Sequence, residues 1–419
     1  MKNRIGSISN KRLLLILFAL VLLSIFVNSI LMCRICVGCL LVGCILMGRK
    51  EPKFLNPFYL FSLTPFTLLI YSDVGGSYML ELTHSTWVLA IINIYAFIFA
   101  MALTPRFKTA SNCIGISSKS GLLLAAFSMY LLTLMCSISS KMNSLFWFSD
   151  IAAIVFALKT KSKVGYLFCA LIFVSSILSG GASKMGMLLF CISFLVCYDK
   201  YYAKRIQWKK IAVLVLSAVV FMIFAFSFAN KDRGHYDAQD GLEHYMKAGG
   251  FEWEHSALLF LPYMYLTTPW TNVQYVVNTQ DNRTNGLWMI KPILGYIGVS
   301  DDYEKEYELV SYSSFNTFTF ICCGFKDFGY WFSILASLFL GFFVKKVYSR
   351  YVISRSPFDI TSYILVALAT TEMFFSNHFY MLSYPFTAFI MMEFYKYITV
   401  LFGNRNIDVE PYVRREVKL

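Results

Sequence analysis

The residue types best suited to acid–base and anion-binding chemistry gather in one polar stretch, from Asn230 to Asp327. Three of the five histidines and most of the acidic residues lie there. Histidine exchanges protons near neutral pH, and arginine pairs with anionic oxygens through parallel hydrogen bonds. The stretch therefore predicts a catalytic loop, and the remaining chain must supply the scaffold that positions it.

That scaffold has the composition of an integral membrane protein. Of the 419 residues, 58% are hydrophobic and 15% are charged, and the mean hydropathy is +0.59. The net charge of +13 comes from Lys and Arg in short bursts between apolar runs rather than along one helix face. Such bursts are typical of the positive-inside rule, so no nucleic-acid partner is predicted.

The apolar runs predict an all-α polytopic protein with about twelve transmembrane helices, or about eleven because two runs are short. Alternating the runs across the membrane places most basic residues and both termini in the cytoplasm. The predicted spans are Leu13–Met47 (two spans, folded back near Asn28 and Arg34), Pro57–Tyr71, Trp87–Leu103, Gly121–Ser137, Leu145–Leu158, Val164–Leu178, Met185–Tyr198, Ile211–Ala229, Phe328–Val344, Ile360–Met373 and Tyr384–Tyr397.

This topology divides the chain into four parts. Residues 1–229 are predicted to form an N-terminal transmembrane bundle of about nine spans, and residues 230–327 an extracytoplasmic catalytic loop. Residues 328–400 supply about three C-terminal spans, and residues 401–419 a cytoplasmic tail. Within the loop, Leu258–Thr267 and Leu287–Val299 are apolar and aromatic, which predicts interfacial or re-entrant helices.

The sequence lacks the usual motifs for nucleotide binding and for metal binding. No Gly-rich phosphate loop follows a strand, and the sequence contains no Asp-x-Asp pair. The acidic run Asp301–Glu308 is interpreted as a solvated rim, and Cys33, Cys36 and Cys39 as packing residues in an apolar hairpin. Asn282-Arg283-Thr284 matches a short glycosylation acceptor pattern. No cofactor and no metal are therefore predicted, and a substrate has to reach the outer face already activated.

A set of short motifs, in a specific order along the chain, resembles the Wzy-type oligosaccharide repeat-unit polymerases, the O-antigen polymerase family. That family often has Arg at the turn where this chain has Lys184. The motifs are Ser179-Gly-Gly-Ala-Ser-Lys184-Met-Gly186, Tyr265-Leu-Thr-Thr-Pro269-Trp-Thr-Asn272, Gly286 leading to Pro292, Asn316-Thr-Phe-Thr319 and Lys326-Asp327-Phe-Gly329.

The resemblance implies a GT-C-like fold and a glycosyltransferase of the bacterial cytoplasmic (inner) membrane. Such an enzyme polymerises undecaprenyl-diphosphate-linked oligosaccharides into a surface polysaccharide, of the O-antigen type found in lipopolysaccharide or of capsule type. Its implied partners are the lipid-linked substrate, membrane lipids, a flippase and a chain-length regulator. The transfer would be metal-independent, so fixed cations must meet the charge that develops on the leaving diphosphate.

The resemblance and this chemistry together select the candidate site residues. The cations that would meet the diphosphate are Arg233, Lys184 and Arg283; the groups that would activate the acceptor are His255, His235 and Asp327; and the substrate-binding candidates are Tyr265, Asn272, Asn316, Thr319 and Lys291. Asp150 is an acid inside a predicted span, where it is functional, part of a structural ion pair with a neighbouring helix, or simply close to the outer interface.

Two alternatives stay open. An O-antigen ligase-type transferase would share the topology, the donor and the leaving group. A lipid-linked oligosaccharide flippase would also have about twelve spans, but it is expected to show two similar halves, and the sequence contains no internal repeat.

Overall fold

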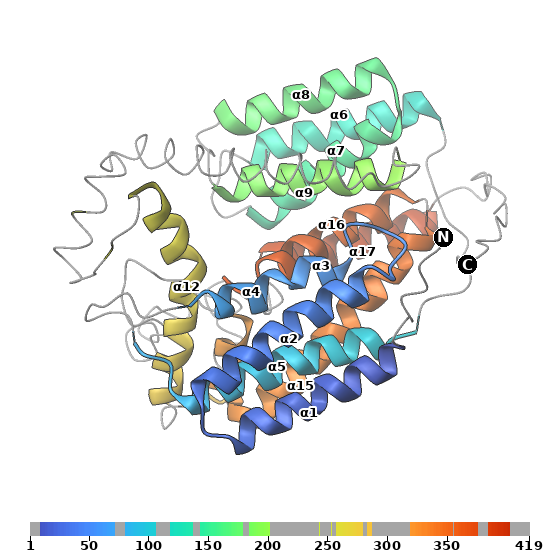
Figure 1. Ribbon diagram of the computed structural model, residues 1–419. Coiled ribbons are helices and arrows are strands. Elements are labelled where there is room, and N and C mark those ends of the chain that lie inside the picture. The colour runs from blue at the N-terminus through green and yellow to red at the C-terminus, as the bar shows by residue number, and fades with distance from the viewer. Residues whose placement is uncertain are drawn as a thin grey trace, which may run out of the picture.

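The computed structural model describes residues 9–71, 80–105, 118–136, 143–178, 184–201, 243, 253, 257–279, 283–286, 319–354, 356–375 and 384–402. Over these residues the chain is all-α, as predicted. The helices are α1 (Asn10–Phe26), α2 (Ile30–Gly48), α3 (Pro57–Phe61), α4 (Leu63–Leu69), α5 (His84–Leu103), α6 (Lys119–Cys136), α7 (Asn143–Lys159), α8 (Lys163–Leu178), α9 (Lys184–Tyr201), α12 (Ala257–Asn278), α15 (Phe320–Ile353), α16 (Pro357–Thr371) and α17 (Tyr384–Phe402) (Figure 1).

Four of these helices, α2, α5, α6 and α15, are long and apolar enough to cross a membrane. Each predicted span that falls on described residues overlaps one helix or two, whereas Ile211–Ala229 lies outside the described residues. The predicted run Pro57–Tyr71 is divided between α3 and α4. A polytopic membrane protein agrees with these helices, and the number of about twelve spans stays a prediction.

The first long apolar run folds back as predicted. Helix α1 ends at Phe26, and α2 begins at Ile30, so Asn28 lies in the turn between them. Ser29 caps α2, because its side-chain oxygen accepts a hydrogen bond from the Met32 amide. Cys33 and Cys36 lie on the buried side of α2, in agreement with their interpretation as packing residues.

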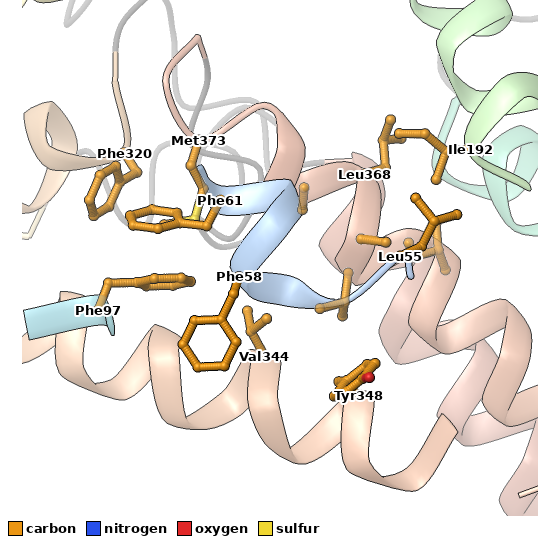
Figure 2. Packing of buried hydrophobic residues seen from close by; sticks show 14 of the residues in the cluster. Leu55, Phe58, Phe61, Phe97, Ile192, Phe320, Val344, Tyr348, Leu368 and Met373 are labelled. Carbon is orange, nitrogen blue, oxygen red and sulfur yellow. The ribbon is translucent and has the colours of Figure 1, made fainter. Parts of the chain in front are cut away.

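The helices gather in two groups with α16 and α17 between them (Figure 1). Helices α1, α2, α5 and α15 pack on one side, and α6 to α9 on the other. Short helix α3 lies inside the first group, where Phe58 and Phe61 are fully buried (Figure 2). Phe61 stacks on Phe97 of α5 with ring centroids 4.1 Å apart, so α3 is part of the core rather than a surface connection.

Helices α5 and α15 run parallel and in close contact. Asn93 bonds to both Ser333 and Ser337, and farther along both helices Phe97 lies against Gly341. A Cβ atom at Gly341 would lie 2.4 Å from the Phe97 carbonyl oxygen, so a side chain there would force the helices apart. The parallel direction agrees with the topology, which sends both segments from the outer face to the cytoplasm.

Helix α15 folds back on itself at Gly329, whose φ of 79° and ψ of −161° are not helical. Gly324 and Ser333 would lie about 13.5 Å apart in a continuous helix, at about 1.5 Å per residue. Instead, a Cβ atom on Gly324 would lie 3.6 Å from the Ser333 Cα atom. Residues 320–328 therefore form a re-entrant arm beside the rest of α15, and the helix begins at Phe320 rather than at the predicted Phe328.

Helix α12 lies at one end of the bundle and crosses the direction of α2 and α5 (Figure 1). It was predicted over Leu258–Thr267, and it extends instead to Asn278 through Pro262 and Pro269. We call the end of the bundle that carries α12 and the Gly329 bend the α12 end. The opposite end carries the 49–56 connection and the last turns of α9 and α15.

Candidate active site

The Gly329 bend brings together two segments that are far apart in sequence. The short segment 283–286 lies against the tip of the re-entrant arm. The Thr284 amide donates to the Lys326 carbonyl oxygen at 3.2 Å, and the Asn285 amide donates to the Asp327 carbonyl oxygen at 3.1 Å. These two backbone bonds fix the register of one segment against the other.

Side chains at the bend add two buried polar contacts. The Thr284 hydroxyl donates to Asp327 Oδ1 at 2.5 Å, and Asp327 is fully buried. Lys326 Nζ donates to the carbonyl oxygen and to Oγ1 of Thr279, at 3.2 and 3.3 Å. A charge that is removed from water needs such partners, because an unsatisfied buried charge costs several kcal/mol. The two contacts hold the last turn of α12 and the 283–286 segment against the re-entrant arm.

Arg283 lies over the bend at the surface. Its guanidinium group approaches Gly329 so closely that a Cβ atom there would lie 3.0 Å from Nη2 and 3.1 Å from Cζ. Gly329 therefore has two reasons to be glycine, its positive φ and the space it leaves for Arg283. Gly286, with a φ of 93°, leaves similar space for the Phe328 ring. Arg283 is exposed, and within the described part of the chain no carboxylate forms an ion pair with it.

Polar contacts fasten α12 to the segment that precedes α5. Tyr71 shares a hydrogen bond of 3.0 Å with Thr271, and the Thr83 amide donates to the Gln274 side chain at 2.8 Å. Trp270 Nε1 donates to Thr67 of α4 at 3.1 Å. These bonds place one face of α12 on the bundle and so fix the position of Thr279 beside Lys326.

The predicted substrate-binding residues of this region are mostly buried. Asn272 and Thr319 have exposures of 1% and 0%, so both side chains are buried in this structure. Tyr265 is partly exposed and packs against Phe375 with ring centroids 5.8 Å apart. Among the three substrate-binding candidates that the structure describes, Tyr265 is the one with an accessible side chain.

The structure describes the positions of only some of the predicted site residues. Arg283 and Asp327 come together at the bend. Lys184 is the first residue of α9, and its side chain lies outside the described atoms. Five further candidates lie outside the described residues: Arg233, His235, His255, Lys291 and Asn316.

The structure also adds residues that sequence reasoning did not select. Lys326 belongs to the motif Lys326-Asp327-Phe-Gly329, but the sequence alone predicts no role for its side chain. Thr284 was considered only as part of a glycosylation acceptor, whereas its hydroxyl is buried against Asp327. One sequence feature could have pointed to Lys326 and to its neighbours: the charged pair Lys326-Asp327 directly before Phe-Gly in an apolar run. Charged side chains inside an apolar run need polar partners when they are buried.

Charges at the opposite end pair with one another. Lys345 forms a buried ion pair with Glu51, and Lys53 pairs with Asp199. Burial lowers the pKa of Lys53, against the opposing effect of the Asp199 charge. A third group joins three helices: Arg350 of α15, Asp359 of α16, and Glu393 and Lys396 of α17. These pairs connect helices, which is a structural role.

Asp150 stands apart from both ends. It is buried on α7 with an exposure of 3%, and its Oδ1 atom has no hydrogen-bond partner among the described residues. The ion pair considered for it from the sequence is not found within those residues.

The comparisons with known proteins do not test the predicted family. No protein-family model matches the chain, and the searches of curated proteins and of solved structures gave no match. The described residues contain no group of three or more His, Cys, Asp or Glu side chains that could hold a metal ion. The chemistry available at the bend is that of an exposed guanidinium beside a buried lysine and a buried carboxylate.

Proposed function

We propose that this protein is a membrane glycosyltransferase that joins undecaprenyl-diphosphate-linked oligosaccharide units into a surface polysaccharide. The transfer forms a bond between an acceptor hydroxyl and the anomeric carbon of the donor, and it breaks the bond from that carbon to the diphosphate. The hydroxyl proton goes to a base, and the bonding electrons leave with the diphosphate. The polymer is of O-antigen or capsule type, and the reaction takes place at the outer face of the cytoplasmic membrane.

The observation that carries the proposal is the position of Arg283 over the Gly329 bend. A planar guanidinium pairs with two phosphate oxygens at once, and Arg283 is exposed to receive them. Lys326 adds a second positive charge on the same re-entrant arm, where its Nζ atom donates to Thr279. Charges that are fixed before the reaction stabilise a developing diphosphate without further reorganisation.

Asp327 serves as a positioning residue in this scheme. Its carboxylate accepts a hydrogen bond from Thr284, the residue next to Arg283 in sequence. The carboxylate is fully buried, so it holds the 283–286 segment in place instead of meeting the acceptor. The proton acceptor is then one of the histidines named from the sequence, His235 or His255.

A ligase-type transferase is the second candidate, because it uses the same donor and leaving group. A deletion strain separates the possibilities. Loss of long chains with one repeat kept on the final acceptor supports a polymerase, and loss of every repeat supports a ligase. Lipid-linked units trapped at the cytoplasmic side would instead support a flippase.

The same strain tests the site. Arg283→Ala, expressed at the level of the wild type, should fail to restore long chains, and Arg283→Lys should restore them poorly because the fork is lost. Lys346→Gln is the matched control, since Lys346 is an exposed cation on α15 near the other end. Normal chain length with Arg283→Ala would remove Arg283 from the site.

A further inference from the structure

Helices α7, α8 and α9 lie on the side of the molecule away from α1 and α5 (Figure 1), and a groove lies among their side chains. It holds about 180 Å³ and is lined by Leu158 of α7, Tyr166 of α8, and Phe194 and Tyr198 of α9. Leu158 is buried at its base, and the three aromatic residues have exposures of 43%, 40% and 48%. The groove thus combines an apolar floor with open aromatic walls.

A lysine-rich turn lies directly beside the groove. Lys159, Lys161 and Lys163 all fall between Leu158 and Tyr166 in the sequence, and Lys161 and Lys163 are exposed. The turn is ordered by its own hydrogen bonds. Thr160 Oγ1 donates to the Ala157 carbonyl oxygen at 2.7 Å, and the Gly165 amide donates to Ser162 Oγ at 3.1 Å. Three positive charges are therefore held at one end of an apolar groove.

We propose that this groove binds an anionic glycerophospholipid, with an acyl chain along Leu158 and Phe194 and the headgroup phosphate at Lys161 and Lys163. The charges are complementary to an anionic headgroup, and the apolar walls suit a chain but not a peptide backbone, whose polar groups would be unsatisfied there. Tyrosines prefer the level of the headgroups, where Tyr166 and Tyr198 would lie. The basic turn also lies on the side that the topology assigns to the cytoplasm, whose leaflet is rich in anionic lipid.

This site is independent of the proposed transfer reaction, so its test needs no activity. The full-length protein is purified, stripped of lipid in detergent, and titrated with phosphatidylglycerol or with phosphatidylcholine of the same acyl chains. Bound lipid is counted by native mass spectrometry, and the thermal unfolding midpoint is followed in parallel. Phosphatidylglycerol should bind and raise the midpoint more than phosphatidylcholine does.

Variants distinguish the contribution of the lipid headgroup to binding from that of the acyl chain. Lys161→Asn with Lys163→Gln should weaken phosphatidylglycerol binding roughly thirty-fold, at about 1 kcal/mol for each lysine. Asn is chosen because Lys161 has a φ of 50°, a conformation that Asn tolerates. Phe194→Trp should also weaken binding, since it fills the groove and leaves the lysines in place. Lys11→Gln with Lys346→Gln removes two exposed lysines elsewhere and should change little.

Three results would overturn the proposal. Equal binding of the two lipids would remove the headgroup site, and an equal loss in the control variant would reduce it to general charge attraction. Unchanged binding in Phe194→Trp would remove the groove as the place of the chain. Stronger binding of a polyprenyl phosphate than of phosphatidylglycerol would also overturn it, because the occupant would then be a carrier lipid.

Discussion

Replacing Gly329 by alanine tests whether the bend in α15 positions Arg283. The residue has a φ of 79° and a ψ of −161°, a region that is essentially open only to glycine. A side chain forced into such a region costs on the order of 1–3 kcal/mol of stability. The new Cβ atom would also lie 3.0 Å from Arg283 Nη2 and 3.1 Å from Cζ, so the guanidinium group has to move.

The two effects have different sizes and are measured separately. Loss of one preorganised contact to a developing charge costs about 2.7–4 kcal/mol, which is roughly a hundred- to a thousand-fold in rate. We expect Gly329→Ala to lower the unfolding midpoint moderately in detergent and to abolish long-chain glycan in a complemented deletion strain. A double variant with Arg283→Ala should lose no more activity than either single variant, because both changes remove the same contact.

Gly324→Ala is the matched control. This residue lies on the same re-entrant arm with helical geometry, and an added Cβ atom would meet Ser333 Cα at 3.6 Å, an ordinary contact. Alanine also favours a helix over glycine by up to about 1 kcal/mol. The control should therefore fold and polymerise normally. Equal activity of Gly329→Ala and Gly324→Ala, at equal expression, would refute the role given to the bend.

Four further outcomes are expected. Thr284→Val should lower stability by roughly 1.5–3 kcal/mol, because the buried Asp327 carboxylate loses a donor, while Thr284→Ser should keep it; thermal unfolding of the purified variants compares them. Lys345→Met should destabilise by about 3–5 kcal/mol because the buried Glu51 carboxylate loses its ion pair with Lys345, and adding Glu51→Met should recover part of the loss in the same assay. A cysteine at position 241 should react with an impermeant thiol reagent in intact cells, and one at position 207 should not; the reverse labelling would contradict the topology. Transfer by the purified protein should continue in a chelator, and loss of activity that a divalent ion restores would return the Asp301–Glu308 run to consideration as a metal site.

The helices could be predicted because hydropathy and length determine them. Runs such as Trp87–Leu103 and Gly121–Ser137 coincide with α5 and α6 within a few residues. The start of α15 could not be predicted in this way, because Lys326 and Asp327 interrupt the apolar run that hydropathy detects. Both charged side chains are buried. Thr279 accepts a hydrogen bond from Lys326, and Thr284 donates one to Asp327; both threonines are distant from these residues in sequence. One sequence read by itself holds no record of such pairings.

The end of α12 was missed for a related reason. The sequence predicts this segment from its apolar and aromatic run Leu258–Thr267, and beyond that run Pro269 and several polar residues interrupt the pattern. The helix continues because α12 is fastened beyond the proline by Trp270, which donates to Thr67, and by Gln274, which accepts from Thr83. Tertiary contacts therefore offset the cost of a proline inside the helix. Helix propensity does not include such contacts, so it cannot predict where α12 ends.

Buried charge alone does not identify the active site, because this chain buries charges at both ends. At the opposite end Lys345 pairs with Glu51, and such a pair cancels most of its own field at a distance. At the α12 end Lys326 donates to two neutral oxygens of Thr279, which satisfy its hydrogen bonds but leave its charge in place. The exposed Arg283 packs against Gly329, which has a positive φ and lies three residues after Lys326 in the sequence. The α12 end thus brings two cations, Arg283 and Lys326, together with one buried carboxylate, Asp327, and the exposed guanidinium among them is the reason why we place the proposed diphosphate chemistry at the Gly329 bend.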